Sequence, residues 1–286
     1  MAQVCSRLLT KWHLSWQLLV IPNLTSHVKL MSAEMAKTVT KNLVNLKTEW
    51  LTIMDGQLTD DSLMPQVVIL AGGLGTRLGK MTEKIPKSLI EVSGKPILTH
   101  ILNWVKQQGC NKVLVLTGHL GEMFEQFEYD GLSIDFHQEP EQLGTGGALS
   151  NAIELLDDEF ILLWGDDLHP IDYSQLLQTH RLGGLLTMTV TQEHEIMNLK
   201  FRNGYVTEYD KTTENNNFNG YEAGTSIVSK KVVEKFIENG KWSWETTVYP
   251  AMSGKIRAHI DNTKFWDMGT PERLKKLEDF LNNRPA

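Results

Sequence analysis

One stretch of the sequence has the composition of a phosphate-binding turn. Residues 70–78 read LAGGLGTRL and directly follow a short apolar run. Glycines allow the backbone to approach a ligand closely and to present its amides to phosphate oxygens. Arg77 adds a guanidinium group that can hold a phosphate through two hydrogen bonds. A tight turn without a ligand would also need glycines, but the threonine and arginine that follow favour a phosphate site.

Two common phosphate motifs do not match this turn. A P-loop ends in Gly-Lys-Ser/Thr, whereas Gly79 and Lys80 are followed by Met81. A dinucleotide fingerprint needs a third glycine where Leu78 stands. The sequence therefore favours neither a P-loop ATPase nor a dehydrogenase.

A second glycine cluster occupies residues 144–147, inside the segment EPEQLGTGGA at 139–148. We expect a loop here that leads into a helix. The positive end of a helix dipole and its free amides suit a negatively charged ligand. A flexible helix entry with no ligand is the alternative.

Carboxylates occur at two places where an α/β sheet could bind a metal ion. Asp166 and Asp167 follow the apolar run that ends at Trp164, and Asp267 lies in the segment FWDMGTPE at 265–272. A carboxylate at the end of a buried strand points into the crevice above the sheet. Magnesium prefers a few carboxylates together with substrate phosphates and water. Turn capping would explain the same aspartates without a metal.

These groups are separated by an alternation of strands and helices. We expect strands at 67–70, 112–117, 134–137, 160–163 and 185–190, and helices at 96–108, 122–127, 148–156 and 173–181. Shorter strands follow at 199–202, 205–209 and 225–228, with helices at 231–238 and 271–281 and another that opens at Trp244. The order predicts an α/β fold with a Rossmann-like, mostly parallel sheet flanked by helices, plus a small antiparallel insertion on the substrate side.

The first 63 residues do not share this pattern. We expect an N-terminal extension of unknown role at 1–63, with one helix at 32–54, and a catalytic domain at 64–286. A signal or transit peptide is a less favoured interpretation of the extension.

Bulk composition excludes some functions. The net charge is −7, which argues against broad binding to nucleic acid. No apolar run is long enough to span a membrane, and the two cysteines lack the spacing of a metal site or a disulfide framework. These features predict a cytoplasmic protein without nucleic-acid or membrane partners, and they leave open whether it forms a homo-oligomer.

The glycine-rich turn continues into a longer signature. Residues 70–98 read LAGGLGTRLGKMTEKIPKSLIEVSGKPIL, which resembles the sugar-phosphate nucleotidyltransferases in LAGG-x-GTRL, Thr82, Pro86-Lys87 and Gly94-Lys95-Pro96. The resemblance extends over most of residues 65–280 and implies the nucleotide-diphospho-sugar transferase fold. No β-helix repeat follows, so the chain is similar to short members such as the guanylyltransferases for heptose or mannose 1-phosphate and the uridylyltransferases for muramate-type sugars.

The resemblance also implies residue roles. It assigns catalysis to Arg77 and Lys87, Mg²⁺ binding to Asp166 and Asp267, and sugar-phosphate binding to Lys211, Glu222, Gly224 and Glu245. Both glycine segments would bind the nucleotide, through Leu70, Ala71, Gly72, Gly73, Gly75, Thr76, Glu139, Gln142, Gly144, Thr145 and Gly147. The family often has asparagine where this chain has Glu222, and the second acid, Asp167, leaves the identity of the metal ligand open.

The reaction that this implies joins a nucleoside triphosphate, with GTP or UTP favoured, to a sugar 1-phosphate and releases pyrophosphate. One alternative is a phosphocholine-type cytidylyltransferase, which a pocket rich in aromatic residues would favour. Another is a non-catalytic nucleotide-binding regulatory module, which the intact Arg77, Lys87, Asp166 and Asp267 argue against.

Overall fold

The computed structural model describes residues 64–212 and 217–283. The helix expected at 32–54 and the rest of the N-terminal extension lie outside the described residues. The extension and the domain boundary before residue 64 therefore stay predictions.

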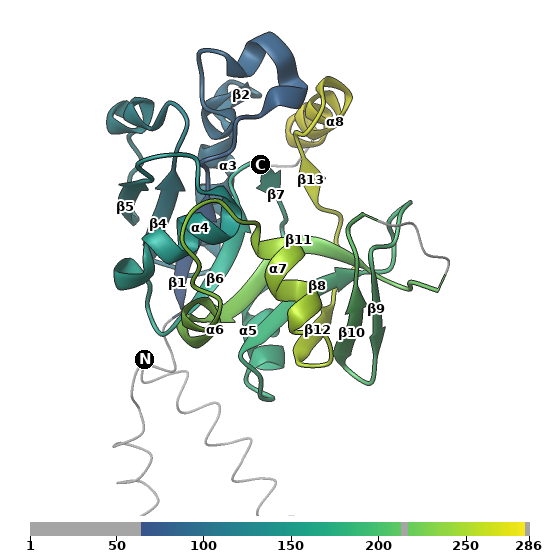
Figure 1. The fold of residues 1–286 in the computed structure, drawn as a ribbon. Coiled ribbons are helices and arrows are strands. Elements are labelled where there is room, and N and C mark those ends of the chain that lie inside the picture. The colour runs from purple at the N-terminus through teal and green to yellow at the C-terminus, as the bar shows by residue number, and fades with distance from the viewer. Residues whose placement is uncertain (1–63, 213–216, 284–286) are drawn as a thin grey trace, which may run out of the picture. The chain divides into compact units, whose positions relative to one another are not determined.

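A large sheet runs through the domain (Figure 1). Its nine strands have the order β5-β4-β1-β6-β11-β8-β12-β10-β9, and two small two-stranded sheets pair β13 with β7 and β2 with β3. The strand pairings orient β10 and β11 opposite to the other strands of the large sheet. The strands are β1 (Gln66–Leu70), β2 (Glu91–Val92), β3 (Lys95–Pro96), β4 (Lys112–Thr117), β5 (Ser133–Gln138), β6 (Glu159–Trp164), β7 (Asp167–Leu168), β8 (Leu186–Thr191), β9 (Leu199–Arg202), β10 (Tyr205–Tyr209), β11 (Tyr221–Ser229), β12 (Ile256–Ile260) and β13 (Trp266–Asp267).

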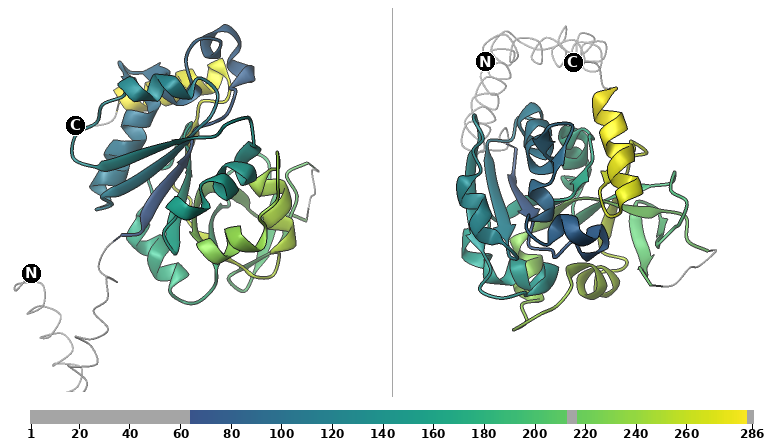
Figure 2. Two further views of the ribbon diagram at one scale, coloured as in Figure 1. Left: turned by 60° about the vertical axis from the view of Figure 1, so that its left-hand side comes forward. Right: turned by 90° about the horizontal axis from the view of Figure 1, so that it is seen from above.

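Helices cover both faces of the sheet, as Figure 2 shows in its left view. The α-helices are α3 (Ile97–Gln107), α4 (Gly144–Asn151), α5 (Tyr173–His180), α6 (Lys230–Lys235), α7 (Trp244–Ala251) and α8 (Pro271–Asn282). Short 3₁₀ helices are η1 (Thr76–Thr82), η2 (Lys87–Leu89), η3 (Gly121–Gln126) and η4 (Ile153–Leu155). No helix in the described ranges is long and apolar enough to cross a bilayer.

Strand β1 shows why the apolar runs of the sequence form the centre of the sheet. All five of its residues are buried. Successive side chains of a strand point to opposite faces. Val68 and Leu70 therefore join the core beneath α4, α6 and α7, while Val67 and Ile69 join the core beneath α3, α5 and α8.

Most of the expected elements are present, and the predicted α/β class is confirmed. Strands at 112–117, 199–202 and 205–209 have the expected bounds, and Thr270 caps α8 ahead of Pro271. The helix expected at 148 begins at Gly144 instead, and the segment expected as a helix at 122–127 is the 3₁₀ helix η3. The sequence prediction also lacked β12, because polar residues interrupt its apolar pattern (IRAHI).

Strand order defines where a ligand can bind. The chain passes from β1 to β4 and β5 on one side and later returns to place β6 on the other side of β1. Open α/β sheets bind ligands at such a reversal, outside the carboxyl ends of the strands. Here that point lies where Leu70 pairs with Trp164.

Candidate active site

A pocket of about 160 Å³ opens at the carboxyl ends of β1 and β6. It contains many of the residues expected to bind a nucleotide, together with three that the sequence analysis did not select, Ser88, Ala148 and Trp164. The expected residues are Leu70, Ala71, Gly72, Gly73, Lys87, Glu139, Gln142, Gly144, Thr145 and Asp166. Gly75, Thr76 and Gly147 do not line this pocket.

The first glycine turn is fixed by its own side-chain contacts. Gly75 adopts a left-handed conformation with φ of 63° just before η1. The Thr82 hydroxyl lies 3.1 Å from the carbonyl oxygens of both Gly75 and Gly79. A Cβ at Gly75 would lie 2.7 Å from the Thr82 side chain, so this glycine is needed for the turn itself.

Glu139 forms one wall of the pocket. Its side chain is 8% exposed, and its Oε2 accepts the Leu143 N–H at 3.2 Å. A Cβ added to Gly72 would lie 2.9 Å from Glu139 Oε1, so the carboxylate packs directly against the glycine turn. Burial raises the pKa of Glu139, while the Leu143 N–H and the charge of Lys241 oppose that shift.

The second glycine cluster forms the first turn of α4 rather than the loop before it. A Cβ at Gly146 would lie 2.1 Å from the Trp242 ring, and one at Gly147 would lie 2.8 Å from the Gly240 carbonyl oxygen. These two glycines are therefore required by packing within the protein. Gly144 and Thr145 face the pocket, and the Thr145 hydroxyl accepts the Trp244 N–H at 2.9 Å.

Two of the charged residues expected from the sequence contact each other. Lys87 is 9% exposed, and its ammonium group forms an ion pair with Asp166. Between β6 and Asp166, the Gly165 N–H donates to the Leu70 carbonyl oxygen at 2.9 Å. A Cβ at Gly165 would lie 2.6 Å from Ser88 Oγ, so only glycine lets the Asp166 segment lie against β1.

Three aspartates come together beside this ion pair. Asp167 lies directly opposite Asp267 in the antiparallel pair of β7 and β13. The Met268 N–H donates to the Asp166 carbonyl oxygen at 3.2 Å, which ties the two segments further. Burial raises the pKa of Asp167 well above its usual value, and the charges of Asp166 and Asp267 raise it further.

Two arginines lie at the Asp267 end of the cluster. Arg273 Nη1 is 3.1 Å from both carboxylate oxygens of Asp267, and the Gly269 N–H donates to Asp267 Oδ1 at 2.8 Å. Arg77 lies against the same turn, because a Cβ at Gly269 would be 3.3 Å from Arg77 Nη2. The structure thus brings Arg77, Lys87, Asp166 and Asp267 to one edge of the sheet.

These aspartates are suited to a magnesium ion that shares its ligands with a substrate. Among residues 64–212 and 217–283, no three His, Cys, Asp or Glu side chains are arranged to hold a metal ion by themselves. Asp166 and Asp267 would therefore supply two carboxylates, and phosphate oxygens and water would complete the coordination. Burial raises the pKa of Asp167, and the charges of Asp166 and Asp267 raise it further; a divalent cation would relieve this repulsion.

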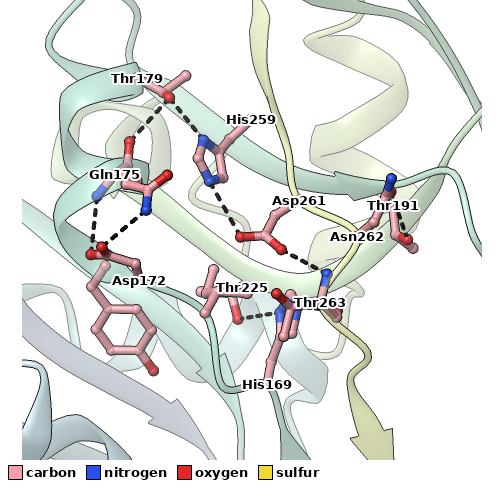
Figure 3. A network of polar contacts seen from close by, with 12 residues as sticks. His169, Asp172, Gln175, Thr179, Thr191, Thr225, His259, Asp261, Asn262 and Thr263 are labelled. Atoms are coloured by element: carbon pink, nitrogen blue, oxygen red, sulfur yellow. Dashed lines mark hydrogen bonds and ion pairs between the residues drawn. The ribbon is translucent and has the colours of Figure 1, made fainter.

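A buried hydrogen-bond network holds the segment that leads to Asp267 (Figure 3). His169 Nε2 lies 3.1 Å from the Thr263 carbonyl oxygen, and its Nδ1 lies 3.1 Å from the Thr225 hydroxyl. A carbonyl only accepts, so Nε2 carries the proton and Nδ1 accepts from Thr225. His169 follows β7 and Thr263 precedes β13, so this contact helps to align the two strands that carry the aspartates.

The residues expected to bind the sugar phosphate lie on the antiparallel side of the sheet. Lys211 follows β10 and forms an ion pair with Glu245 in the first turn of α7. Glu222 and Gly224 belong to β11, where the register shifts between Glu222 and Ser226. A Cβ at Gly224 would lie 3.3 Å from Asp167 Oδ2, so this bulge borders the aspartate cluster.

The structure adds residues that sequence reasoning did not select. Ser88 follows Lys87 directly and Trp164 lies two residues before Asp166, so their position in the sequence was a usable signal. Arg273 lies in the helix expected at 271–281, and its contact with Asp267 required the geometry of the turn. Lys241, which donates to Gln142 Oε1 at 2.6 Å, gave no signal, because it lies far along the chain.

Comparison with known proteins gives consistent matches. The family model for nucleotidyl transferases matches residues 66–259. A D-glycero-alpha-D-manno-heptose 1-phosphate guanylyltransferase of Aneurinibacillus thermoaerophilus is 28% identical over 238 residues, which cover 76% of this chain and 99% of that protein. The mannose-1-phosphate guanylyltransferase catalytic subunit beta of Drosophila pseudoobscura pseudoobscura is 33% identical over 222 residues, which cover 72% of this chain and 60% of that protein.

A solved structure shares the same fold. HddC from Yersinia pseudotuberculosis, crystallised with GMP-PN, superposes with a TM-score of 0.66 and 28% identity, covering 76% of this chain and 100% of that chain.

Proposed function

Since the chain belongs to the nucleotidyl transferase family, we propose that it transfers a guanylyl group from GTP to a sugar 1-phosphate and releases pyrophosphate. Membership confirms the family and the enzyme class that the sequence predicted. The observation that carries the proposal is the meeting of the glycine turn, the Lys87–Asp166 ion pair and Asp267 at the strand-order reversal.

GTP is favoured over UTP as the donor for two reasons. Two relatives that match this chain over nearly their whole length are named guanylyltransferases. Glu139 also places a carboxylate on the pocket wall beside Gly72. Guanine offers a ring N–H and an amino group to such an acceptor, whereas uracil offers only one N–H.

The reaction needs no general base. The acceptor phosphate is ionised at neutral pH, and one of its oxygens attacks the α-phosphorus of GTP while pyrophosphate leaves on the opposite side. Arg77 and Lys87 would stabilise the negative charge that develops on the phosphates. Lys87 is already held at the pocket wall by Asp166, so little reorganisation precedes the reaction.

A Mg²⁺ ion held by Asp166 and Asp267 would reduce the repulsion between the two anionic substrates. Lys211 would bind the phosphate of the acceptor, and Glu245 would accept hydrogen bonds from its sugar hydroxyls. These roles extend the sequence prediction and are supported by the ion pair that holds Lys211 and Glu245 together.

The aromatic residues near the acceptor side do not favour phosphocholine. Tyr221 stacks on His194 at 3.7 Å between ring centroids, and Phe265 is parallel to Tyr221 within 2° at 5.9 Å. These rings therefore pack on one another instead of leaving their faces open to a quaternary ammonium group.

Pyrophosphate release tests the proposal. The four common nucleoside triphosphates are combined with a panel of sugar 1-phosphates and with phosphocholine, in the presence of Mg²⁺. We expect release only with GTP and a sugar 1-phosphate, and its loss in Asp166→Asn. Release with CTP and phosphocholine would establish the alternative enzyme instead, and no release with any pair would contradict the proposal.

A further inference from the structure

A buried carboxyl group lies at the bulge of β11. Glu222 is only 7% exposed. Its N–H donates to Asn198 Oδ1 at 3.0 Å, and its Oε1 accepts the Gly224 N–H at 2.9 Å. Gly224 has a φ of 80°, which turns the chain so that this local bond can form. The backbone therefore fixes the position of the Glu222 carboxylate.

This carboxylate has no cationic partner in the described part of the chain. The nearby Lys211 forms its ion pair with Glu245. Besides the Gly224 N–H, the Trp164 indole N–H donates to the Glu222 carboxylate. Buried acids are usually paired with a cation, because an isolated charge loses much solvation. Glu222 is thus left with capacity to bind a group that comes from outside the protein.

A second buried polar atom nearby is also unsatisfied. Tyr209 is 6% exposed, and its hydroxyl has no hydrogen-bond partner among the residues that the structure describes. Burial raises the pKa of Tyr209, and the charge of Glu222 raises it further. Buried hydroxyls normally have a partner, so this one also points to a bound ligand or water.

The balance of charge changes once an acceptor binds. Among the described residues, Lys211 is the cation whose charge acts on both Glu222 and Glu245. Under the proposed function, the acceptor phosphate draws on Lys211. The two carboxyl groups then share this cation with the phosphate.

We propose that Glu222 sets the charge preference of the acceptor pocket, so that it selects sugar 1-phosphates with neutral or amino-bearing rings and rejects rings that carry a carboxylate. The inference rests on the proposed function, because it takes this region as the sugar site. A carboxylate accepts hydrogen bonds from hydroxyl and ammonium groups, whereas two like charges at close range repel strongly. Muramate-type sugars, which carry an acid, would be excluded as acceptors.

The preference should depend on pH near neutrality. Burial and the charge of Glu245 raise the pKa of Glu222 to about 7, against the opposing effects of Lys211 and of the Gly224 and Trp164 donors. The other titratable groups whose charge is coupled to Glu222 are Asp167 on β7, Tyr209 on β10, Tyr221 on β11 and Tyr249 on α7. Glu222 therefore becomes more ionised between about pH 6 and pH 8, and rejection of acidic rings should strengthen over that range.

Calorimetric titration of the full chain tests the inference independently of turnover. The probes are glucose 1-phosphate, glucosamine 1-phosphate and glucuronate 1-phosphate, which differ in ring charge, each at pH 6 and pH 8. Glu222→Gln removes the charge at nearly constant shape. Glu208→Gln, on strand β10 of the same sheet, removes an exposed acid that pairs with Lys200 and serves as the matched control.

We expect wild-type protein at pH 8 to bind glucuronate 1-phosphate about 100-fold more weakly than glucose 1-phosphate, and to bind glucosamine 1-phosphate at least as well. At pH 6 the discrimination against glucuronate should shrink by about threefold or more. In Glu222→Gln it should fall to about 10-fold or less at both pH values, while Glu208→Gln keeps the wild-type ratios.

Three results would overturn the inference. Equal binding of glucuronate and glucose 1-phosphates by wild-type protein is the first, and an absence of binding by all three probes is the second. The third is a wild-type ratio of glucose 1-phosphate to glucuronate 1-phosphate affinity that does not change between pH 6 and pH 8. This third result can be measured even where Glu222→Gln fails to fold. Binding without charge discrimination, in a protein that still releases pyrophosphate, leaves the proposed function intact, whereas absence of pyrophosphate release with every acceptor contradicts both.

Discussion

The two halves of the large sheet present their candidate sites in different ways. On the side of β1, β4 and β5, three glycines line the pocket, in turns that neighbouring side chains hold in place. On the side of β8, β10 and β11, the charged groups are side chains paired across distant segments, such as Lys211 with Glu245. A site made of backbone tolerates few substitutions, whereas a site made of side chains can change its ligand by changing single residues. The nucleotide side should therefore determine the reaction, and the acceptor side the choice of sugar.

The largest expected effect concerns Asp166, which lies after β6, where the two halves of the sheet meet. Asp166→Asn should lower kcat/KM by about 1,000-fold, because it removes the charge that pairs with Lys87 and that would bind the proposed metal ion. Pyrophosphate release at saturating Mg²⁺ measures the loss. Asp167→Asn is the matched variant, and we expect a clearly smaller loss. A larger loss in Asp167→Asn would identify Asp167, and not Asp166, as the metal ligand.

The next effect should be confined to the acceptor side. Lys211→Met should raise the KM for the sugar 1-phosphate by about 10- to 100-fold, because a charge-assisted bond to its phosphate is lost. The KM for GTP should stay within about twofold. Lys200→Met removes a lysine of similar exposure, paired with Glu208, and should change neither constant. Equal increases in both KM values would show that the halves do not act separately.

Two glycines can distinguish packing from ligand binding on the nucleotide side. Gly146→Ala should lower the free energy of unfolding by about 3 kcal/mol, since its Cβ would lie 2.1 Å from the Trp242 ring. At Gly73, no atom lies within 4 Å of the added Cβ, so Gly73→Ala should keep wild-type stability and raise the KM for GTP. Denaturant unfolding and steady-state kinetics measure the two effects. A stable Gly146→Ala protein would show that this helix is not packed as described.

The smallest effect concerns pH and the network of Figure 3. Burial lowers the pKa of His169 to about 4, from a value near 6.5 in the unfolded chain. The unfolded state therefore binds a proton that the folded state does not, and the free energy of unfolding falls as the pH drops from about 6.5 towards 4. At pH 5 this residue should account for about 2 kcal/mol of that fall.

The matched variant is His169→Gln, whose amide can still donate to Thr263. Its free energy of unfolding should decline less between pH 7.5 and pH 5 than that of wild-type protein. Parallel declines would mean that His169 is not the residue that titrates.

The difference between local patterns and contacts of distant segments explains how much could be predicted from the sequence. Apolar runs such as 112–117 and the signature at 70–98 are local, so they predicted the parallel strands and the glycine turn. Packing of Gly146 on Trp242 and the contact of Arg273 with Asp267 join segments whose approach depends on the whole fold. Gly147 shows the limit most clearly, because its sequence pattern predicted a nucleotide contact, whereas an added Cβ there would lie 2.8 Å from the Gly240 carbonyl oxygen. The cytoplasmic location and the oligomeric state stay predictions.

The pairing of β7 with β13 has a consequence for protein synthesis. A ribosome releases the chain from its N-terminus, so the glycine turn, Lys87 and Asp166 all emerge long before Asp267. A nascent or prematurely terminated chain that ends before Trp266 lacks the strand that aligns the last aspartate and the helix that carries Arg273. Such a fragment cannot assemble the acidic cluster. Only a chain whose translation has passed through α8 can therefore hold all three aspartates and Arg273 together.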